Sequence, residues 1–388
     1  MQLLHTSALV VFWGCAAVIV YTYLMYPVLL IALAALRRGI SAPQQSSDAD
    51  LPTVSVLIVA HNEESVIRER IENLLALDYP KDKLELVIAS DASRDRTVDI
   101  VREYAAQSIR LIAFTARTGK AAVLDSVIPQ LNGSLAVLSD ANTMMEPSAV
   151  RRLVRWFQDP RVGVVCGRLV LTDPVTGTNV DSLYWRIETL MKRSEGKLGA
   201  LLGANGGIYA IRRSVFQGIT HDTIVDDFVI PLLARVRTGC AIIYDESAIA
   251  YEETPPEIAV EFKRRARIGA GGFQSIAVLW PLLDPRKGWI ALTFASHKVL
   301  RWLCPFFLLG LALANLVLVN SGIYGVSLMV GIVLASVALL GQYLSLRSSA
   351  GRALRMTTMF ATMNAALLVG FFRWASGRQR AAWDRTAR

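Results

Sequence analysis

The chain has 388 residues, 53% of them hydrophobic, and a formal net charge of +9. This length holds one α/β domain together with membrane segments, and the composition is more apolar than a soluble enzyme requires. The basic residues gather at the edges of apolar runs rather than on one soluble face, so we expect anionic lipid headgroups as their partner and no nucleic acid. The four cysteines are widely separated, with no Cys-x-x-Cys or Cys/His spacing, which argues against a zinc site.

The first apolar segment has no charged residue before Arg37. It is longer than the about 20 apolar residues that a spanning helix needs. We therefore predict a retained N-terminal transmembrane anchor over residues 1–40. Residues 41–52 are rich in Ser, Asp, Pro and Gln, which is typical of a linker.

Residues 53–275 are predicted to form an α/β domain. A continuous apolar run at 54–60 predicts a strand that is covered on both faces. Helical patterns and short apolar runs then alternate as far as residue 139, which predicts right-handed crossovers and a mostly parallel sheet. Ligands of such sheets bind beyond the carboxyl ends of the strands. The candidate ligand-binding residues at these ends are His61, Asn62, Glu63, Asp91, Lys120 and Asp140.

Asp140 closes the apolar run 135–139, and Asn142 follows two positions later. Two oxygen ligands with this spacing at a strand end are well placed to share a cation. A carboxylate at such a position is also a common turn former, and capping explains Asn62 equally well. The residues alone leave both interpretations open.

Four segments, VAHNEE, SDASRDRT, RTGKAAVL and SDANTMMEP, occur in this order between residues 59 and 147. Together they resemble the nucleotide-binding half of the inverting family-two glycosyltransferases, the group that contains cellulose, chitin and hyaluronan synthases. The resemblance covers residues 50–275 and implies a GT-A-like fold. It also implies that Asp91 reads the uracil of a UDP-sugar and that Lys120 lies near the diphosphate.

The same resemblance implies that Asp140 and residue 142 hold Mg²⁺ or Mn²⁺ on the diphosphate. Here the sequence departs from the family, which usually has Asp where Asn142 stands. An amide oxygen can ligate a hard cation, but it brings less charge. The departure puts the affinity for the metal, and the choice of metal, in question.

The acceptor side is expected in the second half of the domain. The segment GANGGIY at 203–209 resembles the family's small-residue turn beneath the acceptor sugar, which implies acceptor binding by Asn205, Gly206 and Gly207. A tight turn without a ligand is the alternative. The segment TIVDD at 223–227 resembles the family's Thr-Glu-Asp element, which makes Asp227 the catalytic base. Neighbouring helical residues point about 100° apart, so Asp226 is expected to support the acceptor side or to cap the helix.

Arg264 and Arg267 stand where the synthases of the family carry Gln-x-x-Arg-Trp. By this resemblance Arg267 matches the Arg, Arg264 replaces the Gln and Ile268 replaces the Trp. Both arginines are expected to belong to the donor site, and Arg267 would suit the leaving diphosphate. Without the Trp the aromatic platform for a growing sugar chain is lost, so the sequence does not require processive synthesis.

Further membrane segments follow the domain. We predict interfacial helices at 276–301, a transmembrane hairpin at 302–346 with an uncharged turn at 320–322, and a basic tail at 375–388. Residues 347–374 combine a basic loop with a fourth apolar segment that either spans the membrane or lies in its interface. Basic segments favour the cytosolic side, which predicts a multi-pass protein of the inner (plasma) membrane with a cytoplasmic catalytic domain.

The expected function is metal-dependent, inverting transfer from a UDP-sugar to a polysaccharide or lipid-linked acceptor. Transfer of a single sugar to a membrane lipid is the alternative within the same enzyme class. A catalytically silent glycan-binding subunit is a third reading, and a transporter is disfavoured because the predicted spans lack acidic residues. The sequence specifies no partner subunits.

Overall fold

The computed structural model describes residues 2–39, 41–172, 183–253, 258–320, 322–340 and 349–379. The chain divides into two compact units. The sheet unit comprises Leu30–Pro256 and Ala277–Thr293, and the helical unit comprises Met1–Leu29, Glu257–Ile276 and Phe294–Gln379. Residues 257–276, at the end of the range 53–275 assigned above to one domain, thus group with the helices.

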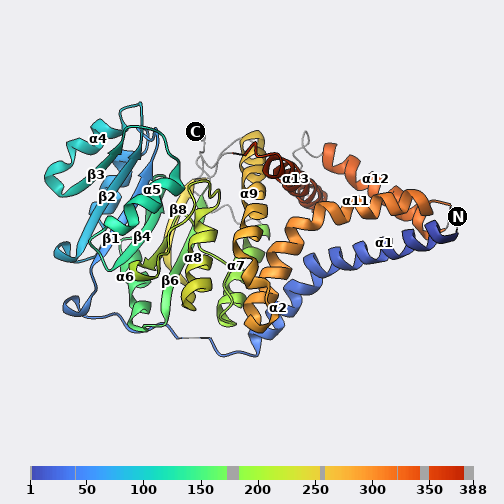
Figure 1. Cartoon of the computed structure of the whole chain (residues 1–388), viewed down its shortest axis with the longest axis horizontal. Helices are drawn as coiled ribbons and strands as arrows, with labels where there is room; N and C mark the ends of the chain where they lie inside the picture. The colour runs from blue at the N-terminus through green and yellow to red at the C-terminus, as the bar shows by residue number, and fades with distance from the viewer. Residues whose placement is uncertain are drawn as a thin grey trace. The chain divides into compact units, whose positions relative to one another are not determined.

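The sheet unit is built on one mixed sheet (Figure 1). Among the described residues the sheet has eight strands in the order β3-β2-β1-β4-β7-β6-β8-β5. The strands are β1 (Val54–Ala60), β2 (Leu84–Asp91), β3 (Ile109–Phe114), β4 (Leu135–Asp140), β5 (Thr143–Met145), β6 (Val162–Thr172), β7 (Tyr209–Arg212) and β8 (Ala241–Glu253).

The first half of this sheet is parallel, because β1 pairs with β2 and β4, and β2 pairs with β3, all in the same direction. Every residue of β1 is buried, as expected for a strand with helices on both faces. The crossovers carry α3 (Ile67–Leu75), α4 (Thr97–Glu103) and α5 (Lys120–Val127). The prediction of an α/β fold with a mostly parallel sheet is confirmed.

Antiparallel strands extend the sheet. β7 runs antiparallel to both β4 and β6, whereas β8 is parallel to β6 and holds β5 antiparallel on its other side. The β6–β8 register shifts after Gly167, where Asp245 is the partner of Gly167 and Ile249 is the partner of Arg168. Residues 246–248 therefore form a bulge in β8, which re-aims the end of that strand toward β5.

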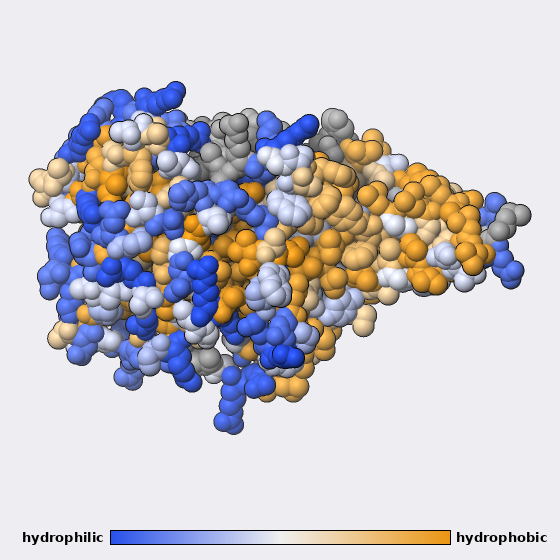
Figure 2. All heavy atoms as spheres, viewed as in Figure 1, coloured by the Kyte–Doolittle hydropathy of each residue, from blue (hydrophilic) through white to orange (hydrophobic). Residues whose placement is uncertain are grey.

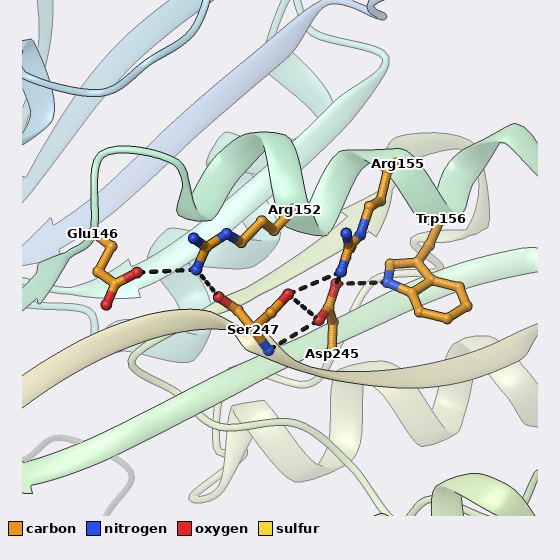
Figure 3. Close-up of polar contacts among 6 residues, drawn as sticks. All are labelled: Glu146, Arg152, Arg155, Trp156, Asp245 and Ser247. Carbon is orange, nitrogen blue, oxygen red and sulfur yellow. Dashed lines mark hydrogen bonds and ion pairs between the residues drawn. The ribbon is translucent and has the colours of Figure 1, made fainter. Parts of the chain in front are cut away.

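A polar cluster holds this bulge against the helix that packs on it (Figure 3). Asp245 accepts hydrogen bonds from Arg155 at 2.7 Å, from the indole of Trp156 at 2.7 Å, and from the hydroxyl of Ser247 at 2.6 Å. Arg152 donates to Glu146 and to the Ser247 carbonyl. The bulge is thus tied to the segment from α6 (Ala149–Val154) into the short 3₁₀ helix Arg155–Gln158.

The other helices of the sheet unit are α7 (Leu183–Lys197), α8 (Asp226–Thr238) and the short α10 (Trp289–Thr293). In the chain α7 precedes β7, α8 lies between β7 and β8, and α10 follows β8. α8 begins with two aspartates and ends at Gly239, whose left-handed conformation (φ 74°) is typical of a glycine that stops a helix.

The helical unit is formed mainly by long apolar helices (Figure 1). α1 (Gln2–Val20) packs against α11 (Leu300–Leu318) through Ala8, Phe12, Ala314 and Leu318. The remaining long helices of this unit are α12 (Ile323–Leu340), α13 (Ser349–Ala375) and most of α9 (Ile258–Leu279), whereas α2 (Tyr26–Ala35) is divided between the two units. Within this unit α13 lies close to α9, because a side chain on Gly370 would meet the carbonyl of Ala266 at 2.6 Å.

Three helical stretches among the described residues are long and apolar enough to cross a membrane: Gln2–Ala35, Trp289–Leu318 and Ile323–Leu340. Their outward side chains are largely apolar, as the visible face in Figure 2 shows for the helices of this unit. Leu313 is 64% exposed, Met329 65% and Ile323 67%. An exposed apolar surface of this kind is typical of a membrane or protein contact rather than of a face that meets water.

Candidate active site

The carboxyl ends of three parallel strands lie together. In the ladder Val59 is the partner of Asp140, and Ala60 is the partner of Ser90, so β1, β2 and β4 end at the same level. The polar residues that follow these strands therefore gather at one edge of the sheet. This is the edge at which the sequence predicts a donor site.

Lys120 is the centre of the charged cluster at this edge. It is the first residue of α5, and its ammonium lies 2.7 Å from Asp140 Oδ1 and 3.3 Å from Asp226 Oδ2. Burial alone would lower the pKa of Lys120, but the neighbouring carboxylates outweigh it and raise the pKa. Lys120 therefore carries a fixed positive charge, with 20% of its side chain exposed.

Asp226 and Asp227 form the first turn of α8, where the free N–H groups of the helix favour negative charge. They meet different partners: Asp226 pairs with Lys120, whereas Asp227 Oδ2 accepts a 3.0 Å hydrogen bond from the Gly206 N–H. Burial and the charge of Asp226 raise the pKa of Asp227. A carboxylate with a raised pKa is a better proton acceptor than an ordinary Asp.

Gly206 lies between the two key carboxylates. A Cβ atom at this position would stand 3.3 Å from Asp140 Oδ2 and 3.3 Å from Asp227 Oδ2. The two carboxylates thus approach the same small residue from two sides. Residues from three separate elements thus form one cluster: Asp140, Lys120, Asp226 and Asp227.

The antiparallel pairing of β7 explains how this glycine reaches the site. Tyr209 at the start of β7 is the partner of Leu138 near the end of β4, so the residues before Tyr209 arrive beside Asp140. Asn205 to Ile208 form a tight turn, closed by a 3.0 Å hydrogen bond from the Ile208 N–H to the Asn205 carbonyl. The predicted small-residue turn is present, and its role in acceptor binding stays a prediction.

Lys192 on α7 is a further charged group on this side, and the sequence reading missed it. Its ammonium donates to Asn205 Oδ1, and Asn205 Nδ2 donates to the Gly167 carbonyl at 2.7 Å. Asn205 is therefore held from both ends. α7 gave no signal for Lys192 because an amphipathic helix normally carries lysines on its solvated face.

Asp91 is fully buried at the end of β2 and holds the loop that leads to Lys120. Its carboxylate accepts hydrogen bonds from the N–H groups of Thr118 at 2.7 Å and Gly119 at 2.9 Å. Gly119 has φ 93°, a conformation that a glycine adopts without strain. Asp91 thus fixes the start of α5, while its predicted contact with uracil stays a prediction.

His61, Asn62 and Glu63 follow β1 and contact the end of β2 and the segment after it. His61 is buried and its Nδ1 donates to the Asp91 carbonyl at 2.6 Å. Asn62 has a positive φ of 56°, and its Oδ1 accepts from the Arg94 N–H at 2.8 Å, while the Glu63 N–H donates to Thr97. A strained backbone at the end of a strand is common at binding sites, so donor binding by this segment remains a prediction.

A buried arginine, which the sequence reading also missed, braces the end of β4. Arg70 on α3 is fully buried and donates to Ser139 Oγ at 2.8 Å, and Ser139 Oγ donates to the Gly207 carbonyl at 2.6 Å. Burial lowers the pKa of Arg70 to about 9, so it stays protonated at neutral pH. Its place on the apolar face of α3, between Ile67 and Leu74, was the available signal.

The predicted metal-binding pair consists of Asp140 and Asn142. Asp140 Oδ1 is bonded to Lys120, and the amide nitrogen of Asn142 donates to Glu252 Oε1 at 3.1 Å. No group of three His, Cys, Asp or Glu side chains able to hold a metal occurs among the described residues. The oxygen donors that are present fit a Mg²⁺ or Mn²⁺ ion that takes one or two protein ligands and completes its shell with substrate phosphates.

Arg264 and Arg267 lie on α9 in the helical unit. Their side chains are partly buried. The predicted contact of these two arginines with the diphosphate therefore stays a prediction.

The model of one protein family, described as "Glycosyl transferase family 2", matches residues 55–220. This segment contains the four motifs and the small-residue turn, in the positions where the strand ends meet. Residues 55–220 form a glycosyl transferase family 2 domain. The predicted family resemblance is thereby confirmed for this part of the chain.

Two curated relatives are similar to this chain over part of its length. The probable glycosyltransferase YdaM of Bacillus subtilis is 32% identical over 57% of this chain and 56% of its own length. A beta-monoglucosyldiacylglycerol synthase of Trichormus variabilis is 26% identical over 65% of this chain and 56% of its own length. The chain spans a little over half the length of these relatives.

A solved structure shares the fold across nearly the whole chain. The mannosyltransferase PcManGT of Pyrobaculum calidifontis, in complex with GDP-Man and Mn²⁺, superposes with a TM-score of 0.72. The match covers 97% of this chain and 99% of that chain, at 22% sequence identity. The GT-A-like fold with apolar helices at both ends of the family 2 domain is confirmed.

Proposed function

We propose that this protein is a membrane-embedded, inverting glycosyltransferase that moves a sugar from a UDP-sugar to a polysaccharide or lipid-linked acceptor. The observation that carries the proposal is the convergence of Lys120, Asp140 and Asp227 around Gly206 at the carboxyl edge of the sheet. At such an edge Lys120 and Asp140 can serve the leaving diphosphate, and Asp227 can serve the attacking hydroxyl.

In the proposed reaction Asp227 accepts the proton of an acceptor hydroxyl. The oxygen attacks the anomeric carbon from the side opposite the diphosphate, and the bond from that carbon to the diphosphate breaks in the same step. The nucleoside diphosphate leaves with the electron pair. The raised pKa of Asp227 suits a base, because its proton affinity lies closer to the working pH.

The leaving group is stabilised on the other side of Gly206. Lys120 places its ammonium beside Asp140, and Asp140 and Asn142 would hold Mg²⁺ or Mn²⁺ through oxygen atoms. A divalent cation bound there neutralises the charge that develops on the diphosphate. Arg264 and Arg267 are proposed to add further positive charge, and Asp91 is proposed to select the uracil.

The acceptor is proposed from two precedents. The beta-monoglucosyldiacylglycerol synthases are named for a glycolipid, and the poly-beta-1,6-N-acetyl-D-glucosamine synthase of Staphylococcus aureus, 24% identical over 58% of this chain, is named for a polysaccharide. Ile268 in place of an aromatic residue favours the single transfer to a lipid, whereas several apolar helices suit a polymer path. Incubation with labelled UDP-sugars, followed by sizing of the product, separates the two.

The experiment that tests the catalytic assignment replaces Asp227 by Asn in the full chain. The amide keeps an oxygen that accepts from Gly206 but cannot take a proton, so we expect transfer to fall about 10²- to 10⁴-fold. Asp99→Asn is the control, because Asp99 is an exposed residue of α4 with 70% of its side chain in solvent. Full sugar transfer by Asp227→Asn would remove the base from the proposal.

A further inference from the structure

The metal-binding motif of this chain has less negative charge than its pattern normally supplies. Asn142 is neutral, and the one carboxylate of the motif, Asp140, is paired with Lys120, whose ammonium lies 2.7 Å from Asp140 Oδ1. A hard divalent cation gains most of its binding energy from charged oxygen ligands. Either the site binds a cation weakly, or a carboxylate from elsewhere in the fold restores the charge.

The structure places such a carboxylate next to Asn142. The amide nitrogen of Asn142 donates a 3.1 Å hydrogen bond to Oε1 of Glu252, 110 residues later in the chain. A carboxylate can only accept at neutral pH, so the NH₂ group of the amide must face Glu252. The amide oxygen, which is the atom that can ligate a metal, is thereby turned away from Glu252 and left for another partner.

Glu252 is held in place by regular structure on both sides. Glu252 directly precedes the last residue of β8, and it pairs with Thr143 in β5 and with Leu171 in β6. The bulge that directs this part of β8 toward β5 is pinned by Asp245 and its neighbours (Figure 3). A carboxylate fixed on a strand positions its hydrogen-bond partner more accurately than one on a loop.

We propose that Glu252 is a positioning residue for the divalent cation of the donor site. It orients the Asn142 amide with its oxygen outward, and it lends the motif the negative charge that Asn142 does not carry. Partners behind a ligand act in this way at many metal sites, and their loss typically costs about 10- to 100-fold in metal affinity. The inference rests on the proposed function, because it presupposes a metal-bound diphosphate at Asp140.

The test measures Mn²⁺ binding rather than turnover. The full chain in detergent is titrated with Mn²⁺ in the presence of UDP, and free Mn²⁺ is followed by its electron paramagnetic resonance signal. In Glu252→Gln the side chain can still accept from Asn142 but has no charge, so we expect the affinity for Mn²⁺ to fall about 10- to 100-fold. Glu253→Gln is the matched control, because the neighbouring glutamate is exposed on the strand and should bind Mn²⁺ as the native chain does.

A second substitution shows whether charge is the property that matters. Asn142→Asp in the Glu252→Gln background moves the carboxylate from residue 252 to residue 142, and we expect the Mn²⁺ affinity to return to within a few-fold of native. This restoration also excludes a folding defect as the cause of the loss. The inference is overturned if Glu252→Gln binds Mn²⁺ like the native chain, or if the double variant binds as weakly as Glu252→Gln. A native chain that binds no Mn²⁺ with UDP would overturn both this inference and the metal part of the proposed function.

Discussion

The two adjacent carboxylates at the start of α8 make different contacts. Asp226 pairs with Lys120, whereas Asp227 binds the Gly206 N–H. The charge of Asp226 nevertheless acts on Asp227 and raises its pKa, second only to burial. Because the pKa of Asp227 is higher in the folded chain than in the unfolded chain, the fold favours the protonated form. The free energy of unfolding therefore falls as the pH rises from the unfolded-state pKa through the folded-state pKa of Asp227.

This coupling predicts the pH dependence of an Asp226→Asn variant. In the proposed reaction sugar transfer requires ionised Asp227, so kcat/KM is expected to fall when the pH drops below its pKa. Without the charge of Asp226 that pKa decreases, and the acid limb of the profile should move to lower pH. The measurement is kcat/KM against pH for both chains, with Asp99→Asn as the unshifted control. A limb that stays in place, or that moves to higher pH, contradicts the coupling.

Sequence reading found the residues that end elements and missed those that brace them. Lys120, Asp140 and Asp227 stand at the ends of predicted elements, where the order of the motifs along the chain draws attention to them. Arg70 and Glu252 reach the site from the side of a helix and the end of a late strand. Their contacts join residues 69 and 110 positions apart, a distance over which local periodicity carries no information.

At the scale of elements, the parallel strands were predictable and the antiparallel ones were not. Alternating apolar and helical patterns predict the run from β1 to β4, because crossovers of that type have one handedness. β7, a strand of four residues, and β5, one of three, are too short to show a period. Yet the pairing of β7 with β4 brings Gly206 to the site, and the pairing of β5 with β8 brings Asn142 next to Glu252. The second half of the site thus depends on pairings that only the structure shows.

The bulge in β8 makes a prediction about stability. Asp245 is buried and receives hydrogen bonds from Arg155, Trp156 and Ser247. Asp245→Ala leaves the Arg155 guanidinium without its carboxylate, so we expect a loss of about 3 to 5 kcal/mol in the free energy of unfolding. Asp99→Ala, which removes an exposed ion pair, should change little. Equal unfolding midpoints for the two variants would show that the cluster does not hold the bulge.

At the scale of the whole molecule, the helices predict a topology. If the three apolar stretches cross the membrane and the basic segments stay on the cytosolic side, we expect the turn near Asn320 outside and the family 2 domain inside. In a chain whose four cysteines are replaced by Ala, Asn320→Cys should react with a membrane-impermeant maleimide in intact spheroplasts. Lys81→Cys, next to β2, should react only after permeabilisation. The reverse pattern would place the catalytic domain on the wrong side for a cytosolic UDP-sugar.

The proposed function depends above all on a metal-dependent site for a nucleoside diphosphate, formed by Lys120, Asp140 and the turn at Gly206. The most direct measurement is calorimetric titration of the full chain with UDP, with and without Mn²⁺, for the native protein and Asp140→Asn. We expect Mn²⁺ to strengthen UDP binding by the native chain and Asp140→Asn to abolish this gain. UDP binding that is indifferent both to Mn²⁺ and to the loss of the Asp140 charge would contradict it.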